Sequence, residues 1–196
     1  MTKSLQWLGA TAALLLVAGC GDRDSGNAAG NGPAATEAGA QTIASGLDEN
    51  SRFLAAARAA GMDATLAGPG PYTVLVPSDQ AFGNLPDGRL ETLMQPESRA
   101  ELTRLLTYHV LTGTVLAEDI GRAIDNSDGR ALLATIGGET LTATRDGGNI
   151  LLADAAGGRA TITRADETRS NGVVHHIDGV LMPGQGVAPQ GEQQQQ

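Results

Sequence analysis

The sequence predicts an α+β domain, with helices in its first half and a β-meander in its second half. Three observations lead to this fold class. Apolar residues recur at helical spacing between residues 42 and 111, beside residues that cap helices. Between residues 131 and 164, short apolar segments are separated by Gly-Gly pairs, which indicates hairpins. A β-branched run at residues 173–181 is typical of a central strand buried on both faces.

Capping residues mark the first expected helices. A short helix is predicted at residues 42–47. Asn50 or Ser51 begins a second helix at residues 52–60, because either side chain can accept a hydrogen bond from an amide of the first turn. Gly61 ends this helix, since glycine tolerates the left-handed conformation that follows a helix end.

A rigid turn at residues 68–71 leads into the first expected strand, residues 72–76, which Pro77 stops because proline lacks an N–H group. Ser78 then begins a helix whose apolar side includes Phe82.

Two further helical patterns follow. The first covers residues 85–95. The second begins at Ser98, where Ser98 and Glu101 fit a capping box. Its buried stripe is predicted to consist of Leu102, Leu105, Leu106 and His109. A further helical turn is expected at residues 118–124.

The remaining elements are predicted to be strands. The meander is expected at residues 131–136, 139–145, 150–153 and 159–164. Asn171 and Gly172 then predict a tight hairpin, because both tolerate positive φ. The last strand follows this turn and stops at Pro183.

Three segments resemble the signatures of fasciclin domains. They are Tyr-Thr-Val-Leu-Val-Pro-Ser-Asp-Gln-Ala-Phe at residues 72–82, Leu-x-Tyr-His-Val-Leu-x-Gly at 106–113, and Asn-Gly-Val-Val-His-x-Ile-Asp-x-Val-Leu-x-Pro at 171–183. The resemblance covers residues 41–183 and implies a β-sandwich or wedge of two sheets, with several short helices packed along one edge. The residues that carry these signatures include Ser78, Phe82, His109, Asn171, Gly172, His175 and Asp178.

The start of the chain resembles a bacterial lipoprotein signal. Lys3 precedes an apolar run, and Val-Ala-Gly-Cys at residues 17–20 resembles a lipobox. We therefore expect residues 1–19 to be a signal peptide and Cys20 to be lipidated. The alternative is an ordinary secretory signal with a chance cysteine. Residues 20–40 are expected to form a flexible tether and residues 184–196 a disordered, glutamine-rich tail.

The net charge of the chain and the expected lipid at Cys20 restrict the binding partners that we expect. Without Lys3, the chain keeps 12 of its 13 basic residues against 22 acidic residues, a formal net charge of −10. This acidic balance disfavours nucleic acid and anionic lipid. We expect membrane contact through the lipid at Cys20 alone, at the bacterial cell envelope. Gly21 lacks the aspartate that retains many lipoproteins at the inner membrane, so the outer membrane is preferred.

No catalytic residue, metal site or cofactor is predicted. His175 and His176 are neighbours on a strand and point to opposite faces, so they cannot bind one ion together. His175 shares a face with apolar residues and is expected inside, hydrogen-bonded, whereas His176 is expected to be more exposed. The sequence contains no Gly-x-Ser-x-Gly nucleophile motif, and an enzyme is not expected.

The resemblance implies a function in cell adhesion, matrix association or protein–protein interaction, with an unknown envelope or extracellular macromolecule as partner. In animal adhesion members, a Tyr-His segment and an Asp-Ile pair are linked to integrin binding. Tyr108 and His109 match the first, and Asp166 matches the aspartate, but Glu167 replaces the isoleucine. The alternative role for Tyr108 and His109 is core packing. An alternative function is transport of a small apolar ligand such as a pigment or lipid. The oligomeric state stays open.

Overall fold

The computed structural model describes residues 41–184 of the 196-residue chain. The expected signal peptide, the lipidated Cys20, the tether and residues 185–196 of the expected tail lie outside the described residues. Within the described range, no helix is both long enough and apolar enough to cross a membrane.

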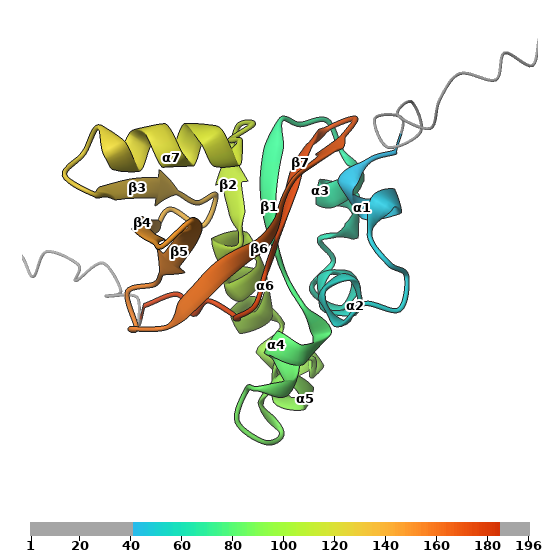
Figure 1. Cartoon of the computed structure of the whole chain (residues 1–196). Coiled ribbons are helices and arrows are strands. Elements are labelled where there is room, and N and C mark those ends of the chain that lie inside the picture. The colour runs from blue at the N-terminus through green and yellow to red at the C-terminus, as the bar shows by residue number, and fades with distance from the viewer. Residues whose placement is uncertain (1–40, 185–196) are drawn as a thin grey trace, which may run out of the picture. The chain divides into compact units, whose positions relative to one another are not determined.

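The helices are mostly short, and they precede or interrupt the strands as the sequence predicts (Figure 1). The helices are α1 (Ile43–Gly46), α2 (Arg52–Ala60), α3 (Asp63–Ala67), α4 (Asp79–Gly83), α5 (Arg89–Leu93), the 3-10 turn η1 (Pro96–Ser98), α6 (Arg99–Tyr108) and α7 (Ala117–Asp125). The strands are β1 (Tyr72–Pro77), β2 (Val110–Thr112), β3 (Arg130–Ala134), β4 (Thr140–Asp146), β5 (Asn149–Ala153), β6 (Arg159–Arg169) and β7 (Gly172–Ile177).

All seven described strands belong to one sheet, in the order β2-β1-β7-β6-β5-β4-β3. Only β1 and β7 are parallel neighbours, and the other pairs are antiparallel. The sheet is nearly closed, because Leu111 of β2 forms a bridge with Thr135, just after β3. The α+β class is confirmed, but the expectation of two separate sheets is not.

The long strand β6 explains why one sheet replaces two. Its first half pairs with β5, where Leu152 lies opposite Ala160, and its second half pairs with β7, where Thr168 lies opposite Val173. Two irregularities between Ile162 and Glu167 separate these halves. Such bulges bend a strand and increase its twist. The meander and the β1–β7 pair therefore join through one bent strand.

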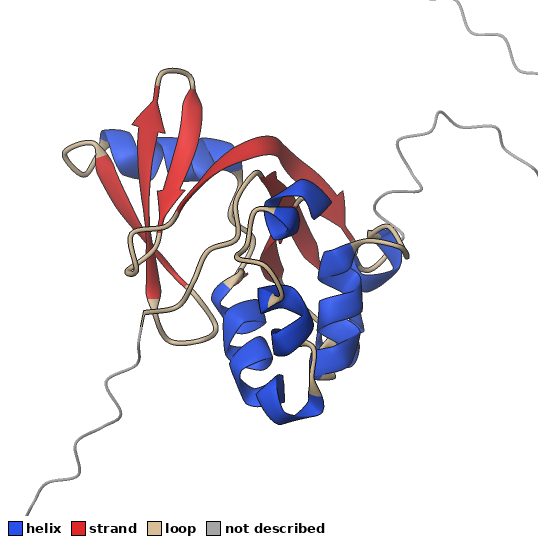
Figure 2. Cartoon of the chain, turned by 90° about the horizontal axis from the view of Figure 1, so that it is seen from below, coloured by secondary structure: helices blue, strands red, loops and turns tan. Residues whose placement is uncertain are grey.

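The strands β1 and β7 run between two apolar cores, which is why β7 is buried on both faces. Val74 and Val174 face the core built with helices α1 to α6, whereas Leu75 and Ile177 face the core built with α7 and the meander. Figure 2 shows most helices gathered on one side and the meander, backed by α7, on the other. The prediction of a central last strand is confirmed.

The predicted helix caps are confirmed at two of three serines. The hydroxyl groups of Ser51 and Ser78 accept hydrogen bonds from the backbone N–H groups of Leu54 and Ala81, at 3.3 and 3.1 Å. The capping box at Ser98 is wrong. The 3-10 turn that begins at Pro96 runs directly into α6, so Ser98 makes no cap hydrogen bond. The helix predicted from residue 85 starts only at Arg89, after Gly88 in a left-handed conformation.

The last strand ends at Ile177, earlier than predicted. Asp178 leaves the ladder and its carboxylate accepts a hydrogen bond from the N–H of Thr161, at 2.6 Å. Beyond it, backbone N–H groups bond to side chains from distant elements. Leu181 donates to His109 at 3.1 Å and Met182 donates to Asp154 at 2.7 Å. Because these side chains satisfy the backbone N–H groups of Leu181 and Met182, this segment does not need to pair with a neighbouring strand.

Candidate binding site at the β6–β7 hairpin

An open groove of about 630 Å³ lies where the β6–β7 turn meets the loop before β1 and the start of α1. It is lined by Thr42, residues 67–71, Thr114 and residues 168–173. These residues are mainly glycine, proline, threonine and alanine, and none is aromatic. The walls therefore consist largely of backbone and small side chains, and their shape depends on how the hairpin is held.

Asn171 holds the hairpin to the helices. Its side-chain oxygen accepts a hydrogen bond from the N–H of Ile43 at 2.8 Å, and its side-chain nitrogen donates to the carbonyl oxygens of Leu66 and Gly68, at 2.9 and 2.8 Å. The residue is buried. The sequence predicted this hairpin because both Asn171 and Gly172 tolerate positive φ. In the structure only Gly172 has a positive φ, of 155°, and Asn171 acts through its side-chain hydrogen bonds instead.

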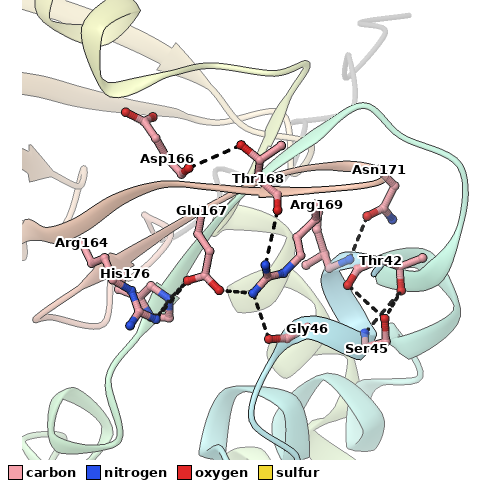
Figure 3. Close-up of polar contacts among 11 residues, drawn as sticks. Thr42, Ser45, Gly46, Arg164, Asp166, Glu167, Thr168, Arg169, Asn171 and His176 are labelled. Atoms are coloured by element: carbon pink, nitrogen blue, oxygen red, sulfur yellow. Dashed lines mark hydrogen bonds and ion pairs between the residues drawn. The ribbon is translucent and has the colours of Figure 1, made fainter. Parts of the chain in front are cut away.

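Arg169 fixes the other side of the turn. Its side chain is 6% exposed, and it donates a hydrogen bond to the carbonyl oxygen of Gly46 at 3.1 Å and pairs with Glu167 (Figure 3). An added Cβ at Gly46 would lie 2.0 Å from Nε of Arg169, so a larger residue there would displace the arginine side chain. That Nε is buried without a hydrogen-bond partner in the described part of the chain. No pattern around Arg169 identifies this packing in the sequence.

Glu167 links the buried Arg169 to Arg164 and His176. One carboxylate oxygen pairs with Arg169, and the other lies 2.9 Å from Nε2 of His176 and 3.0 Å from Arg164 (Figure 3). Burial alone would raise the pKa of Glu167, but the hydrogen bond from His176 and the charges of Arg169 and Arg164 outweigh it and lower the pKa. His176 is 23% exposed, more than its neighbour His175.

His175 ties the hairpin to the start of α7. It has no exposed surface, its Nε2 lies 2.8 Å from the carbonyl oxygen of Val115, and its Nδ1 accepts a hydrogen bond from the N–H of Asp166 at 3.1 Å. Burial lowers the pKa of His175, although the contacts with Val115 and Asp166 act in the opposite direction. Asp166 in turn accepts a hydrogen bond from the N–H of Ala117 at 2.8 Å. The expected burial of His175 is confirmed.

Tyr108 and His109, the candidate interaction segment, lie in the core with 1% and 0% of their surface exposed. Nδ1 of His109 lies 2.8 Å from the carbonyl oxygen of Leu105, while Nε2 accepts from Leu181. Burial lowers the pKa of His109 to about 4 and raises the pKa of Tyr108 to about 12. Core packing therefore describes this pair, which offers almost no surface to a partner in this structure.

The other predicted signature residues also sit at structural positions. Phe82 is buried against the helical core, and Ser78 caps α4. Gly172 lies against β1, where an added Cβ would be 1.9 Å from the carbonyl oxygen of Tyr72. Asp178 ends β7. The structure brings only Asn171 and Gly172 to the groove and distributes the other signature residues through the fold.

Among residues 41–184, no three His, Cys, Asp or Glu side chains gather as metal ligands would. The charged residues near the groove are paired with one another or with backbone groups. The groove therefore presents backbone groups and small side chains, and Arg169, the charged residue among those that line it, is engaged by Glu167 and the carbonyl oxygen of Gly46.

A bent, nearly closed seven-stranded sheet, with most helices on one side and α7 behind the meander, is the α+β architecture of fasciclin domains. The structure resembles that of a FAS1 domain pair from the insect cell adhesion molecule fasciclin I, with a TM-score of 0.51 and 22% sequence identity over 66% of this chain and 44% of that one. At this identity, the likeness shows the fold alone.

The chain belongs to the fasciclin domain family, since the family model of the Fasciclin domain matches residues 48–183. It is 36% identical to protein sll1483 of Synechocystis over 141 residues, which cover 72% of this chain and 71% of that protein. It is also 36% identical to mouse stabilin-1 over 125 residues, which cover 63% of this chain but only 4% of stabilin-1. The family consists of adhesion-type domains that are not enzymes.

Proposed function

We propose that this protein is an adhesion or protein-interaction module of the bacterial cell envelope, held by a lipid on Cys20, with the outer membrane preferred. The fasciclin fold and the adhesion-type relatives support the interaction role. The lipobox-like residues 17–20 support the anchor, because Cys20 is the single cysteine of the chain and stands at the expected cleavage position. The twenty residues from Gly21 to Ala40 provide the span between lipid and domain.

The groove at the hairpin is the observation that carries the proposal. Its volume of about 630 Å³ and its open, backbone-rich walls suit several residues of an extended polypeptide. Sites for small apolar molecules are usually enclosed and lined by aromatic and large aliphatic side chains. No residue lining this groove is aromatic. The groove therefore favours a polypeptide partner over the alternative of a pigment or lipid carrier.

The experiment compares a deletion strain with strains that express wild-type or altered protein. The double variant Thr114→Arg and Thr168→Arg places two long side chains at exposed positions of the groove. Thr92→Arg, exposed on α5 and outside the groove, is the matched control. We expect surface attachment and capture of envelope proteins to fall for the groove variant and to stay at the wild-type level for Thr92→Arg.

Two results would contradict the proposal. One is normal attachment and capture in the deletion strain. The other is a purified protein that turns over a substrate and loses this turnover through a point substitution. Visible absorbance that copurifies with the protein would support the carrier function instead.

A further inference from the structure

His175 and Asp166 are arranged so that one added proton must change their hydrogen bonds. Nδ1 of His175 accepts a hydrogen bond from the backbone N–H of Asp166 at 3.1 Å, so the ring carries its proton on Nε2 and donates it to the carbonyl oxygen of Val115, at 2.8 Å. The ring is therefore neutral, because an imidazolium has donors on both nitrogens. The Asp166 carboxylate meanwhile accepts a hydrogen bond from the N–H of Ala117, the first residue of α7, at 2.8 Å.

Asp166 is the carboxylate that acts on His175 within residues 41–184, and the other charged group that does so is His176 of the same strand. On the β1 side, the neighbour of His175 is the apolar Leu75. The first-turn carboxylates of α7 are exposed and pair within their own helix, Glu118 and Asp119 with Arg122. Figure 3 shows the carboxylates of Asp166 and Glu167 on opposite sides of β6. A positive charge on His175 would therefore attract Asp166 first.

Asp166 can move without breaking the pairing of β6 with β7. It lies within a register shift between Arg164 and Glu167, where it has no ladder partner in β7. Its φ of 60° places it in the left-handed region, which few residues other than glycine adopt. Its side chain is 42% exposed, and Oδ1 lies 3.9 Å from Nδ1 of His175. A shift of roughly 1 Å therefore brings this oxygen within hydrogen-bond distance of the ring.

We propose that protonation of His175 moves the Asp166 carboxylate from the start of α7 to the imidazolium, and that this exchange makes the groove sensitive to acid. A proton on Nδ1 faces the backbone N–H of Asp166, so two donors meet and repel. The carboxylate relieves this repulsion by accepting Nδ1–H in a charge-assisted hydrogen bond, which is stronger than its bond to the N–H of Ala117. Because burial lowers the pKa of His175 below 6.5, the ring is neutral at pH 7 and the exchange takes place in acid.

The exchange reaches the groove through the segment between β2 and α7. This segment contains Thr114, which lines the groove. The hydroxyl of Thr73 holds its middle, accepting a hydrogen bond from the N–H of Val115 at 2.8 Å, and Asp166 holds its end through Ala117. Loss of the contact at Ala117 frees this end, so the wall at Thr114 changes as the pH falls. This consequence rests on the proposed function of the groove, whereas the exchange itself does not.

NMR titration of the full chain tests the exchange without a binding partner, with Cys20→Ser in every sample so that no lipid is attached. As the imidazole of His175 titrates, the amide signals of Ala117 and Thr114 should shift with the same midpoint. The hydrogen-exchange protection of the Ala117 amide should fall about tenfold. The proposal is overturned if Ala117 does not respond, if it follows the carboxyl of Asp166 instead, or if His175 stays neutral until the domain unfolds. A Thr114 amide that does not shift would overturn the link to the groove.

Asp166→Asn keeps an oxygen that can accept from the N–H of Ala117 but removes the charge that attracts the imidazolium. In this variant the midpoint of His175 should move to lower pH, and the amides of Ala117 and Thr114 should no longer respond to it. Asp87→Asn, exposed before α5, removes the same charge and should behave as the wild type. Wild-type midpoint and amide responses in Asp166→Asn would overturn the proposal. These results do not depend on whether the groove binds a polypeptide, which the attachment experiment tests separately.

Discussion

The side-chain oxygen of Asn171 accepts a hydrogen bond from the backbone N–H of Ile43, 128 positions earlier in the chain, at 2.8 Å. This contact joins the first described helix to the last hairpin. Together with the bonds from Asn171 to Leu66 and Gly68, it fixes three walls of the groove relative to one another. One side chain thus couples the shape of the candidate site to the stability of the domain.

Asn171→Ala should lower the free energy of unfolding by about 3 kcal/mol, because it leaves buried backbone groups of Ile43 and Leu66 without partners. Urea denaturation measures this change. Asn126→Ala is the matched control, since Asn126 is exposed after α7 and should change stability by less than about 0.5 kcal/mol. Equal stability of the two variants would show that the Asn171 contacts are not important.

Gly172→Ala should destabilise the domain by roughly 3 kcal/mol or prevent folding, because the added Cβ would lie 1.9 Å from the carbonyl oxygen of Tyr72 and force β1 and β7 apart. Gly148→Ala is the control, since a Cβ there meets open space. Thermal melting compares the two. A melting temperature for Gly172→Ala equal to that of the Gly148 variant would contradict the close packing of the two strands.

Acid should destabilise the protein through its buried histidines. The pKa of His109 is lowered to about 4, from 6.5 in an unfolded chain. Between these values the unfolded state binds a proton that the folded state does not, so stability is complete above pH 6.5 and falls as the pH drops toward 4. The loss through His109 should be about 3 kcal/mol. His175, whose pKa is also lowered, adds to the loss in the same direction.

Denaturation at pH 7 and pH 4.5 measures this dependence. In His109→Ala the overall stability should be lower at pH 7, since Leu181 loses the acceptor of its N–H group, and the decrease toward acid should be smaller. A metal chelator should leave the melting temperature of the wild type unchanged. An unaltered pH dependence in His109→Ala would argue against this origin of acid sensitivity.

The two serines Ser78 and Ser98 should respond differently to the same substitution. Ser78→Ala removes the hydrogen bond to the N–H of Ala81 and should cost about 1 kcal/mol. Ser98→Ala should have almost no effect, because Ser98 makes no cap hydrogen bond. Equal losses in chemical denaturation would indicate that Ser98 caps α6 after all.

Cys20→Ser tests the proposed anchor. Without the thiol that receives the lipid, the protein should leave the membrane fraction or accumulate with its signal peptide uncleaved. Fractionation and gel mobility distinguish these results from the wild type. A Cys20→Ser protein that stays in the membrane fraction at wild-type mobility would disprove lipid attachment at this residue.

The sequence by itself determined the α+β class, the family, the order of most elements and the burial of His175. These features depend on local signals, such as a serine before a helix or apolar residues that alternate along a strand, and such signals are readable within a few positions. The signatures around Tyr108 and Asn171 also identified the family. They did not show that Tyr108 is buried or that the Asn171 side chain bonds the hairpin to Ile43, Leu66 and Gly68.

Only the tertiary structure decided the features that depend on distant partners. The last strand ends at Ile177 because His109 and Asp154, from other elements, bind the amides of Leu181 and Met182. Bulges in β6 turn the expected pair of sheets into one, and the groove arises where Asn171 meets α1 and the loop before β1. Each of these results from contacts between residues far apart in the chain, whose geometry is set only when the two cores pack against β1 and β7.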